Sequence, residues 1–138
     1  MRMRTLPLLM LPALLPGACT QTQAEVERAQ VRDAGVQEKL AKELAGLVPG
    51  KPTTCISLFP QKQSSGYGAT ILYRVNNGLV YRTDTNGGCA GIARGDVLVT
   101  RTPSGQVCRG DIAQTFDQQS RFPTGSCSFG EFVPYRKP

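Results

Sequence analysis

The sequence contains no histidine and no tryptophan, and only 7% of its 138 residues are aromatic. Without histidine, the commonest general base and the commonest metal ligand of proteins are missing. Catalytic triads that depend on histidine, zincin motifs and zinc fingers built on paired Cys and His are therefore excluded. The length allows one small domain with an appendage.

The carboxylates do not supply another catalytic set. Asp96, Asp111, Asp117 and Glu131 are scattered, and no spacing predicts that two of them share a cleft. Residues 87–91 form a glycine-rich run that lacks the lysine of a phosphate-binding loop. We therefore predict a non-enzymatic protein with no cofactor and no metal.

The first 18 residues have the features of an export signal. Arg2 and Arg4 precede an apolar stretch, residues 5–16, which is too short for a transmembrane helix. Residues 15–19, Leu-Pro-Gly-Ala-Cys, are similar to a bacterial lipobox, although the leucine lies one position further from the cysteine than usual. We expect residues 1–18 to be a lipoprotein signal peptide and Cys19 to carry the lipid, palmitate included.

The number of cysteines supports a lipid on Cys19. The chain has five cysteines, and an unpaired thiol in an oxidising compartment is chemically exposed. Thr20 stands where an aspartate would favour retention in the inner membrane, so we expect an outer-membrane anchor with the protein facing the periplasm. The alternative is cleavage after Ala18 or Ala24, which would leave a soluble periplasmic or secreted protein.

The residues after Cys19 predict a tether and then a helix. Residues 19–32 are polar and suit a tether. Over residues 33–48, an apolar stripe at helical spacing predicts an amphipathic helix that packs on the following domain, with Asp33 as its N-cap and Pro49-Gly50 as its end. The stripe consists of Val36, Leu40, Leu44 and Leu47.

Residues 52–138 have the signals of a β domain. A strand is expected at 54–59, a polar loop at 61–68, and a hairpin from 69–75 and 79–83. A three-residue hairpin loop with a left-handed Gly78 pairs Tyr73 with Tyr81 and makes one face consistently apolar or aromatic.

Two further strand predictions complete the domain. We expect a second hairpin from residues 97–101 and 106–108, joined by a turn at 102–105, and a final strand at 128–133. The predicted fold class is α+β, with the N-terminal amphipathic helix packed on a small antiparallel β-sheet or partly closed barrel. Because this domain is small, cross-links contribute strongly to its stability, and we describe 52–138 as a disulfide-stapled β domain.

Four cysteines remain once Cys19 is assigned to the anchor. Cys55–Cys108 with Cys89–Cys127 is the pairing we favour, and the other two connectivities stay open. Zinc bound by all four thiolates or a redox pair is disfavoured, because the sequence has no Cys-x-x-Cys.

The charge is concentrated in the β domain. Residues 1–18 contain Arg2 and Arg4, so their removal lowers the net charge from +6 to +4. Arginine forks suit phosphate and carboxylate, so the excess is compatible with an anionic partner such as lipopolysaccharide phosphates or peptidoglycan carboxylates, with Arg74, Arg82 and Arg101 as candidate ligands. A basic surface that serves only solubility is the plainer interpretation. Nucleic acid is disfavoured by export and by the lack of a basic-aromatic motif.

Several segments resemble a family of small uncharacterised envelope lipoproteins of Gram-negative alphaproteobacteria. Besides the lipobox, the likeness extends over residues 45–138 and is carried by Gly50-Lys51-Pro52, Cys55-Ile56-Ser57-Leu58, Asp96-Val97-Leu98-Val99, Cys108 and Gly130-Glu131-Phe132-Val133-Pro134-Tyr135. The resemblance implies that Cys55 and Cys108 form the family's cysteine pair, and it implies no catalytic residue. Small periplasmic lysozyme inhibitors are a second comparison, which the basic charge disfavours.

The sequence therefore predicts a non-enzymatic lipoprotein that binds or supports a component of the cell envelope. The alternative is an inhibitor or recognition module for a secreted or periplasmic enzyme or protein.

Overall fold

The computed structural model describes residues 22–60 and 63–138 and begins with one long helix. Helix α1 runs from Gln23 to Glu43. It starts at a capping box, in which the Thr22 hydroxyl accepts from the Glu25 N–H and the Glu25 carboxylate accepts from the Thr22 N–H at 3.0 Å. These hydrogen bonds lower the pKa of Glu25.

The helix differs from its predicted bounds at both ends. It begins ten residues before the predicted residue 33, because the capping box at Thr22 starts the helix within the segment that was expected to be a tether. It ends at Glu43, before the predicted residue 48, and a turn with Gly46 at φ 75° follows. The apolar stripe nevertheless packs on the sheet as predicted, since Leu40 is buried and both Leu44 and Leu47 contact the same cluster.

The β domain is built on one seven-stranded antiparallel sheet. Its strand order is β3-β4-β5-β9-β8-β6, and β1 also pairs with β9. The sheet strands are β1 (Val48–Pro49), β3 (Gln63–Tyr67), β4 (Thr70–Asn76), β5 (Leu79–Thr85), β6 (Val97–Thr100), β8 (Ile112–Phe116) and β9 (Pro123–Arg136). A separate ribbon pairs β2 (Cys55–Ser57) with β7 (Gln106–Cys108), and a short 3₁₀ helix, η1 (Ala90–Arg94), precedes β6.

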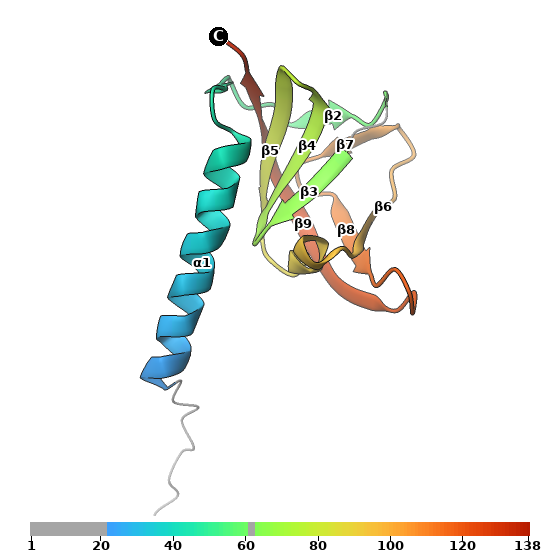
Figure 1. The fold of residues 1–138 in the computed structure, drawn as a ribbon. Helices are drawn as coiled ribbons and strands as arrows, with labels where there is room; N and C mark the ends of the chain where they lie inside the picture. The colour runs from blue at the N-terminus through green and yellow to red at the C-terminus, as the bar shows by residue number, and fades with distance from the viewer. Residues whose placement is uncertain (1–21, 61–62) are drawn as a thin grey trace, which may run out of the picture.

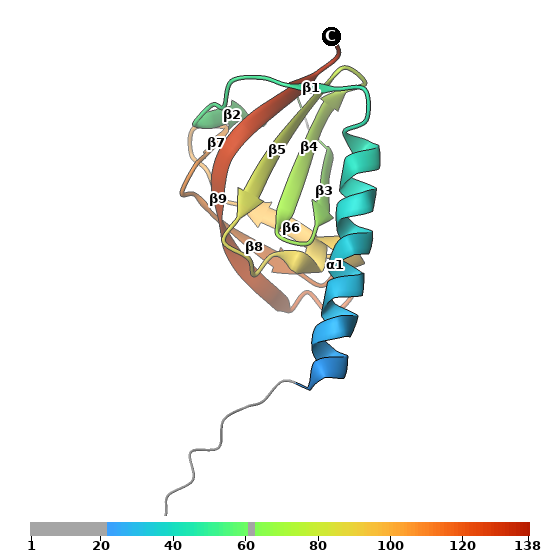
Figure 2. The same cartoon turned by 90° about the vertical axis from the view of Figure 1, so that its left-hand side faces the viewer.

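Strand β9 joins the two halves of the sheet. Its N-terminal part pairs with β8, and its C-terminal part pairs with β5. The sheet curls along this long strand into a half-barrel, and α1 lies beside the β3–β4–β5 half (Figures 1 and 2). The fold is thus mostly β, with its helix at the N-terminal edge.

The first predicted hairpin is right in register and wrong in its loop. Tyr73 lies opposite Tyr81, as predicted. Gly78, however, is not left-handed: the Asn76 side-chain oxygen accepts from the Gly78 N–H at 2.8 Å, and the ladder shifts between Arg74 and Asn76. The extra residue that keeps the side-chain faces of β4 and β5 aligned therefore lies within β4, at the register shift, and not in the loop.

The second predicted hairpin is wrong. Strand β6 pairs with β8, whereas β7 pairs with β2 and places Val107 opposite Ile56. This pairing buries both side chains, which are at most 4% exposed. The prediction missed β8 altogether, took β3 for a loop and began β9 five residues late.

The main core lies inside the half-barrel. Tyr73, Phe129 and Phe132 form its aromatic centre, with ring centroids about 6 Å apart. Such tilted and edge-on contacts suit the quadrupoles of the rings. Burial raises the pKa of the Tyr73 phenol, which is hydrogen-bonded to Thr100 of β6.

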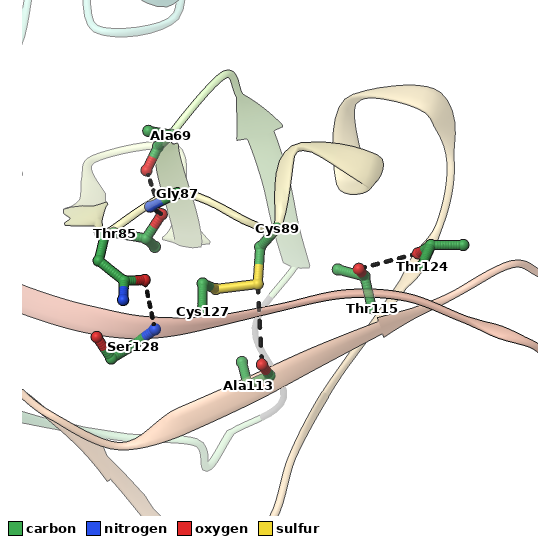
Figure 3. Close-up of a disulfide and its surroundings, with 10 residues drawn as sticks. Ala69, Thr85, Gly87, Cys89, Ala113, Thr115, Thr124, Cys127 and Ser128 are labelled. Carbon is green, nitrogen blue, oxygen red and sulfur yellow. Dashed lines mark hydrogen bonds between the residues drawn. A yellow bond between two sulfur atoms is a disulfide. The ribbon is translucent and has the colours of Figure 1, made fainter. Parts of the chain in front are cut away.

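Two disulfides cross-link the domain in the pairing favoured from the sequence. Cys55–Cys108 joins β2 to β7, and Cys89–Cys127 joins the start of η1 to β9. Figure 3 shows the Cys89–Cys127 disulfide, whose Sγ of Cys89 lies 3.9 Å from the Ala113 carbonyl oxygen. Gly88 has φ 86°, and a side chain there would collide with the Ser126 carbonyl, so the glycine-rich run is a tight connection beside the disulfide.

Candidate binding face

The outer face of β4 and β5 is covered by α1. Leu72 and Val80 are at most 3% exposed, because Leu40 of the helix, with Leu44 and Leu47 just after it, packs against them. The domain therefore has a second, smaller apolar cluster outside the half-barrel. The helix therefore keeps Leu72 and Val80 out of reach of a ligand.

Two of the three predicted anion-binding arginines belong to this covered face, and both have partners. The Arg74 guanidinium lies 2.6 Å from the Glu43 carboxylate of α1, and Arg82 lies 3.1 Å from Asp84. Burial by itself lowers the pKa of Arg82, but Asp84 and a hydrogen bond with Tyr135 raise it above its ordinary value. Arg74 thus links β4 to α1. Arg82 pairs with Asp84 of its own strand and hydrogen-bonds with Tyr135 of β9.

The third predicted arginine lies elsewhere. Arg101 follows β6, and both β8 and β9 separate β6 from β5 in the sheet. The structure therefore does not bring Arg74, Arg82 and Arg101 together into one site. Arg101 belongs instead to the outer face of β6 and β8.

The outer face of β6 and β8, which we call the β6–β8 face, is uncovered and apolar. Val97 is 44% exposed, Val99 38% and Ile112 59%. On β8 the usual size pattern is reversed, because Ile112 and Phe116 point outward whereas the small Ala113 and Thr115 are fully buried. Exposed apolar side chains gathered on one face of a soluble domain are typical of a binding surface.

Two open hollows mark this face. The larger, of about 570 Å³, is lined by Val97, Val99, Phe116, Asp117, Gln118 and Arg121. The smaller, of about 310 Å³, is lined by Val99, Arg101, Asp111, Ile112 and Gln114. An apolar floor thus has one arginine at each end, Arg101 and Arg121.

The loop after β8 holds Arg121 in a fixed geometry. The Asp117 carboxylate accepts from the backbone N–H of Ser120 at 2.7 Å, from the Ser120 hydroxyl and from the Gln119 N–H. These bonds lower the pKa of Asp117, the Ser120 N–H most of all. Backbone bonds from the Asp117 N–H to the Phe122 carbonyl and from the Arg121 N–H to the Asp117 carbonyl close the loop, with Arg121 at φ 61°.

The acidic groups near this face are occupied within the protein. Asp96 is 9% exposed, and its carboxylate accepts from the Thr124 hydroxyl at 2.5 Å, which also contacts Thr115 (Figure 3 draws the two threonines). Asp111 accepts from the Cys108 N–H at 2.8 Å. Asp96, Asp111 and Asp117 each bind a different part of the chain but keep their negative charge, so each hollow is lined by one arginine and one aspartate.

Within residues 22–60 and 63–138, three or more His, Cys, Asp or Glu side chains nowhere gather as metal ligands would. Among the helices of this described part, none combines the length and the apolar character needed to cross a membrane. Cys19 and the predicted signal peptide lie outside the described residues.

Comparison of the chain with protein-family models, with curated proteins and with solved structures finds no match. The candidate site therefore depends on the geometry of this chain alone.

Proposed function

We propose that this chain is a non-enzymatic lipoprotein of the cell envelope that binds an anionic envelope component through the β6–β8 face. In this proposal the lipid on Cys19 anchors the protein in the outer membrane, facing the periplasm. The observation that carries it is an uncovered apolar face with Arg101 and Arg121 at its two ends. Lipopolysaccharide, through its phosphates, and peptidoglycan, through its carboxylates, are the partners considered.

The arginines set the chemistry of the proposed ligand. A guanidinium fork binds phosphate or carboxylate with two parallel hydrogen bonds. Arg74 and Arg82 already have carboxylate partners within the chain, whereas no ion pair joins Arg101 or Arg121 to an acid of the described residues. The proposed anion ligands are therefore Arg101, retained from the sequence prediction, and Arg121, which the prediction did not include.

Binding can be tested with two envelope probes and a matched control. We expect Arg101→Gln and Arg121→Gln each to weaken binding to lipopolysaccharide micelles or to isolated peptidoglycan by about tenfold or more, as for hydrogen bonds to charged groups. Arg109→Gln is the control, because it removes the same charge from a residue paired with Glu131. Retention of neither probe by the unchanged protein, or equal losses in all three variants, would overturn the proposal.

The anchor is tested separately. Growth with radioactive palmitate should label the protein in its native host, and Cys19→Ala should abolish the label. A label that persists in Cys19→Ala would remove the lipid from Cys19, and a protein that is never labelled would leave the soluble periplasmic or secreted form.

A second candidate function, recognition of a secreted or periplasmic protein, is favoured by the apolar floor of the same face. Val97, Val99 and Ile112 are the kind of side chains that protein interfaces bury. A pull-down from periplasmic extract that returns a protein, and loses it in Ile112→Asp, would favour this function over an anionic envelope component.

A further inference from the structure

We infer that the end of the domain that carries the loop 117–122 contacts an anionic phospholipid bilayer, with Phe122 entering the interface and Arg121 binding a lipid phosphate. This inference rests on the proposed lipid anchor, which would hold that end of the molecule near the membrane.

The first support is the exposure of Phe122. Its side chain is 71% exposed although the residue is fixed in a closed turn. The Phe122 carbonyl accepts from the Asp117 N–H at 3.0 Å, and the Phe122 N–H donates to the Ser120 hydroxyl. The aromatic ring is therefore presented to solvent by an ordered backbone, and its insertion into a membrane interface would require little reorganisation.

The second support is the charge around that ring. Arg121 is the adjacent residue and is exposed, and Arg94 at the end of η1 has a side chain 68% exposed. The Asp96 carboxylate lies 3.9 Å from the Arg94 guanidinium and accepts from Thr124, whereas the Asp117 carboxylate accepts from its own loop. Arg121, which no ion pair joins to an acid of the described residues, is thus able to bind a lipid phosphate beside the exposed ring, and an arginine near an anionic leaflet contributes about 1 kcal/mol.

The third support is the position of the anchor. The N-terminus of α1 and the loop 117–122 lie at the same end of the molecule in both views (Figures 1 and 2). Cys19 precedes the N-cap Thr22 by three residues, and three residues of chain reach at most about 11 Å. A lipid on Cys19 would thus hold this end of α1 near the bilayer.

The geometry also fixes how the molecule must lie. Helix α1 has 21 residues, about 31 Å of length, and its N-terminal end extends beyond the sheet (Figure 1). Contact between the loop and the bilayer therefore requires α1 to be inclined to the membrane and not perpendicular to it.

The absence of tryptophan makes the test direct. Phe122→Trp introduces a single tryptophan at the loop, and Phe59→Trp is a matched control. Phe59 is 75% exposed and follows β2. Strand β2 and the loop 117–122 lie at opposite ends of the domain (Figure 1). Both variants are made in the full chain with Cys19→Ala, so that no lipid contributes to binding.

The probes are vesicles of phosphatidylglycerol and of phosphatidylcholine. We expect the emission of the tryptophan at position 122 to shift to shorter wavelength and to be quenched by brominated lipid, only with phosphatidylglycerol. The tryptophan at position 59 should not respond. Arg121→Gln should weaken binding about fivefold.

The outcomes separate this inference from the proposed function. If neither tryptophan responds, or if position 59 responds as strongly as position 122, the bilayer contact is wrong. A palmitate label that persists in Cys19→Ala, or a protein that is never labelled, would overturn the anchor without affecting the vesicle result. Binding to lipopolysaccharide without binding to phosphatidylglycerol would overturn the inference and keep the proposed function.

Discussion

The two halves of the sheet are stabilised differently. In the β4–β5 half, Leu72 and Val80 are buried from outside by α1, so apolar packing covers both faces. In the β6–β8 half the outer face is uncovered, and the disulfide Cys89–Cys127 ties β9 to the segment before η1. A sheet face that stays free for binding gains no stability from burial. A disulfide supplies stability without covering that face.

The largest expected effect comes from removing the cross-link of the uncovered half. Loss of either disulfide removes about 4 kcal/mol by loop entropy, since the sequence separations are 38 and 53 residues. Cys89 and Cys127 are also 2% exposed, so Cys89→Ala with Cys127→Ala additionally loses buried sulfur contacts. We expect this double variant to be less stable to urea than Cys55→Ala with Cys108→Ala; the reverse order would break the comparison.

A matched pair of truncations tests the two outer faces themselves. Leu72→Ala under the helix should lower the free energy of unfolding by about 2–4 kcal/mol, because it leaves a cavity. Ile112→Ala on the β6–β8 face should change it by less than about 0.5 kcal/mol, since the side chain is 59% exposed. Urea denaturation measures both, and a costly Ile112→Ala would mean that this face is structural.

The smallest effect concerns the loop that presents Arg121. Hydrogen bonds lower the folded-state pKa of Asp117, so their contribution is present above the ordinary aspartate pKa and is lost as the pH falls through the lowered value. Amide resonances of Gln119 and Ser120 should titrate with a midpoint below about 4, and Asp117→Asn should remove that titration. A midpoint at or above the ordinary value would contradict the ordered loop.

The sequence was most informative where burial follows the usual pattern. The apolar stripe of α1 and the pairing of Tyr73 with Tyr81 were predicted correctly, because each places apolar side chains on one consistent face. The favoured disulfide connectivity is also the one in the structure, although the spacing of the cysteines left the alternatives open.

The failures lie mostly in the half that we propose to bind. Strand β8 was missed because its large residues Ile112 and Phe116 face outward and its small residues Ala113 and Thr115 face the core, which conceals the alternation. The sequence grouped Arg101 with Arg74 and Arg82 as anion ligands. In the structure, β8 and β9 lie between Arg101 and the other two, and Arg74 is paired with Glu43. Local sequence could not reveal these long-range pairings.

The central claim is that the covered half is structural and that the uncovered half is the contact surface. Hydrogen–deuterium exchange of the full chain with phosphatidylglycerol vesicles or lipopolysaccharide tests it most directly. We predict slower exchange in residues 97–101 and 112–122 and no change in 70–85. Protection confined to 70–85 or to α1, or no protection anywhere, would contradict the account.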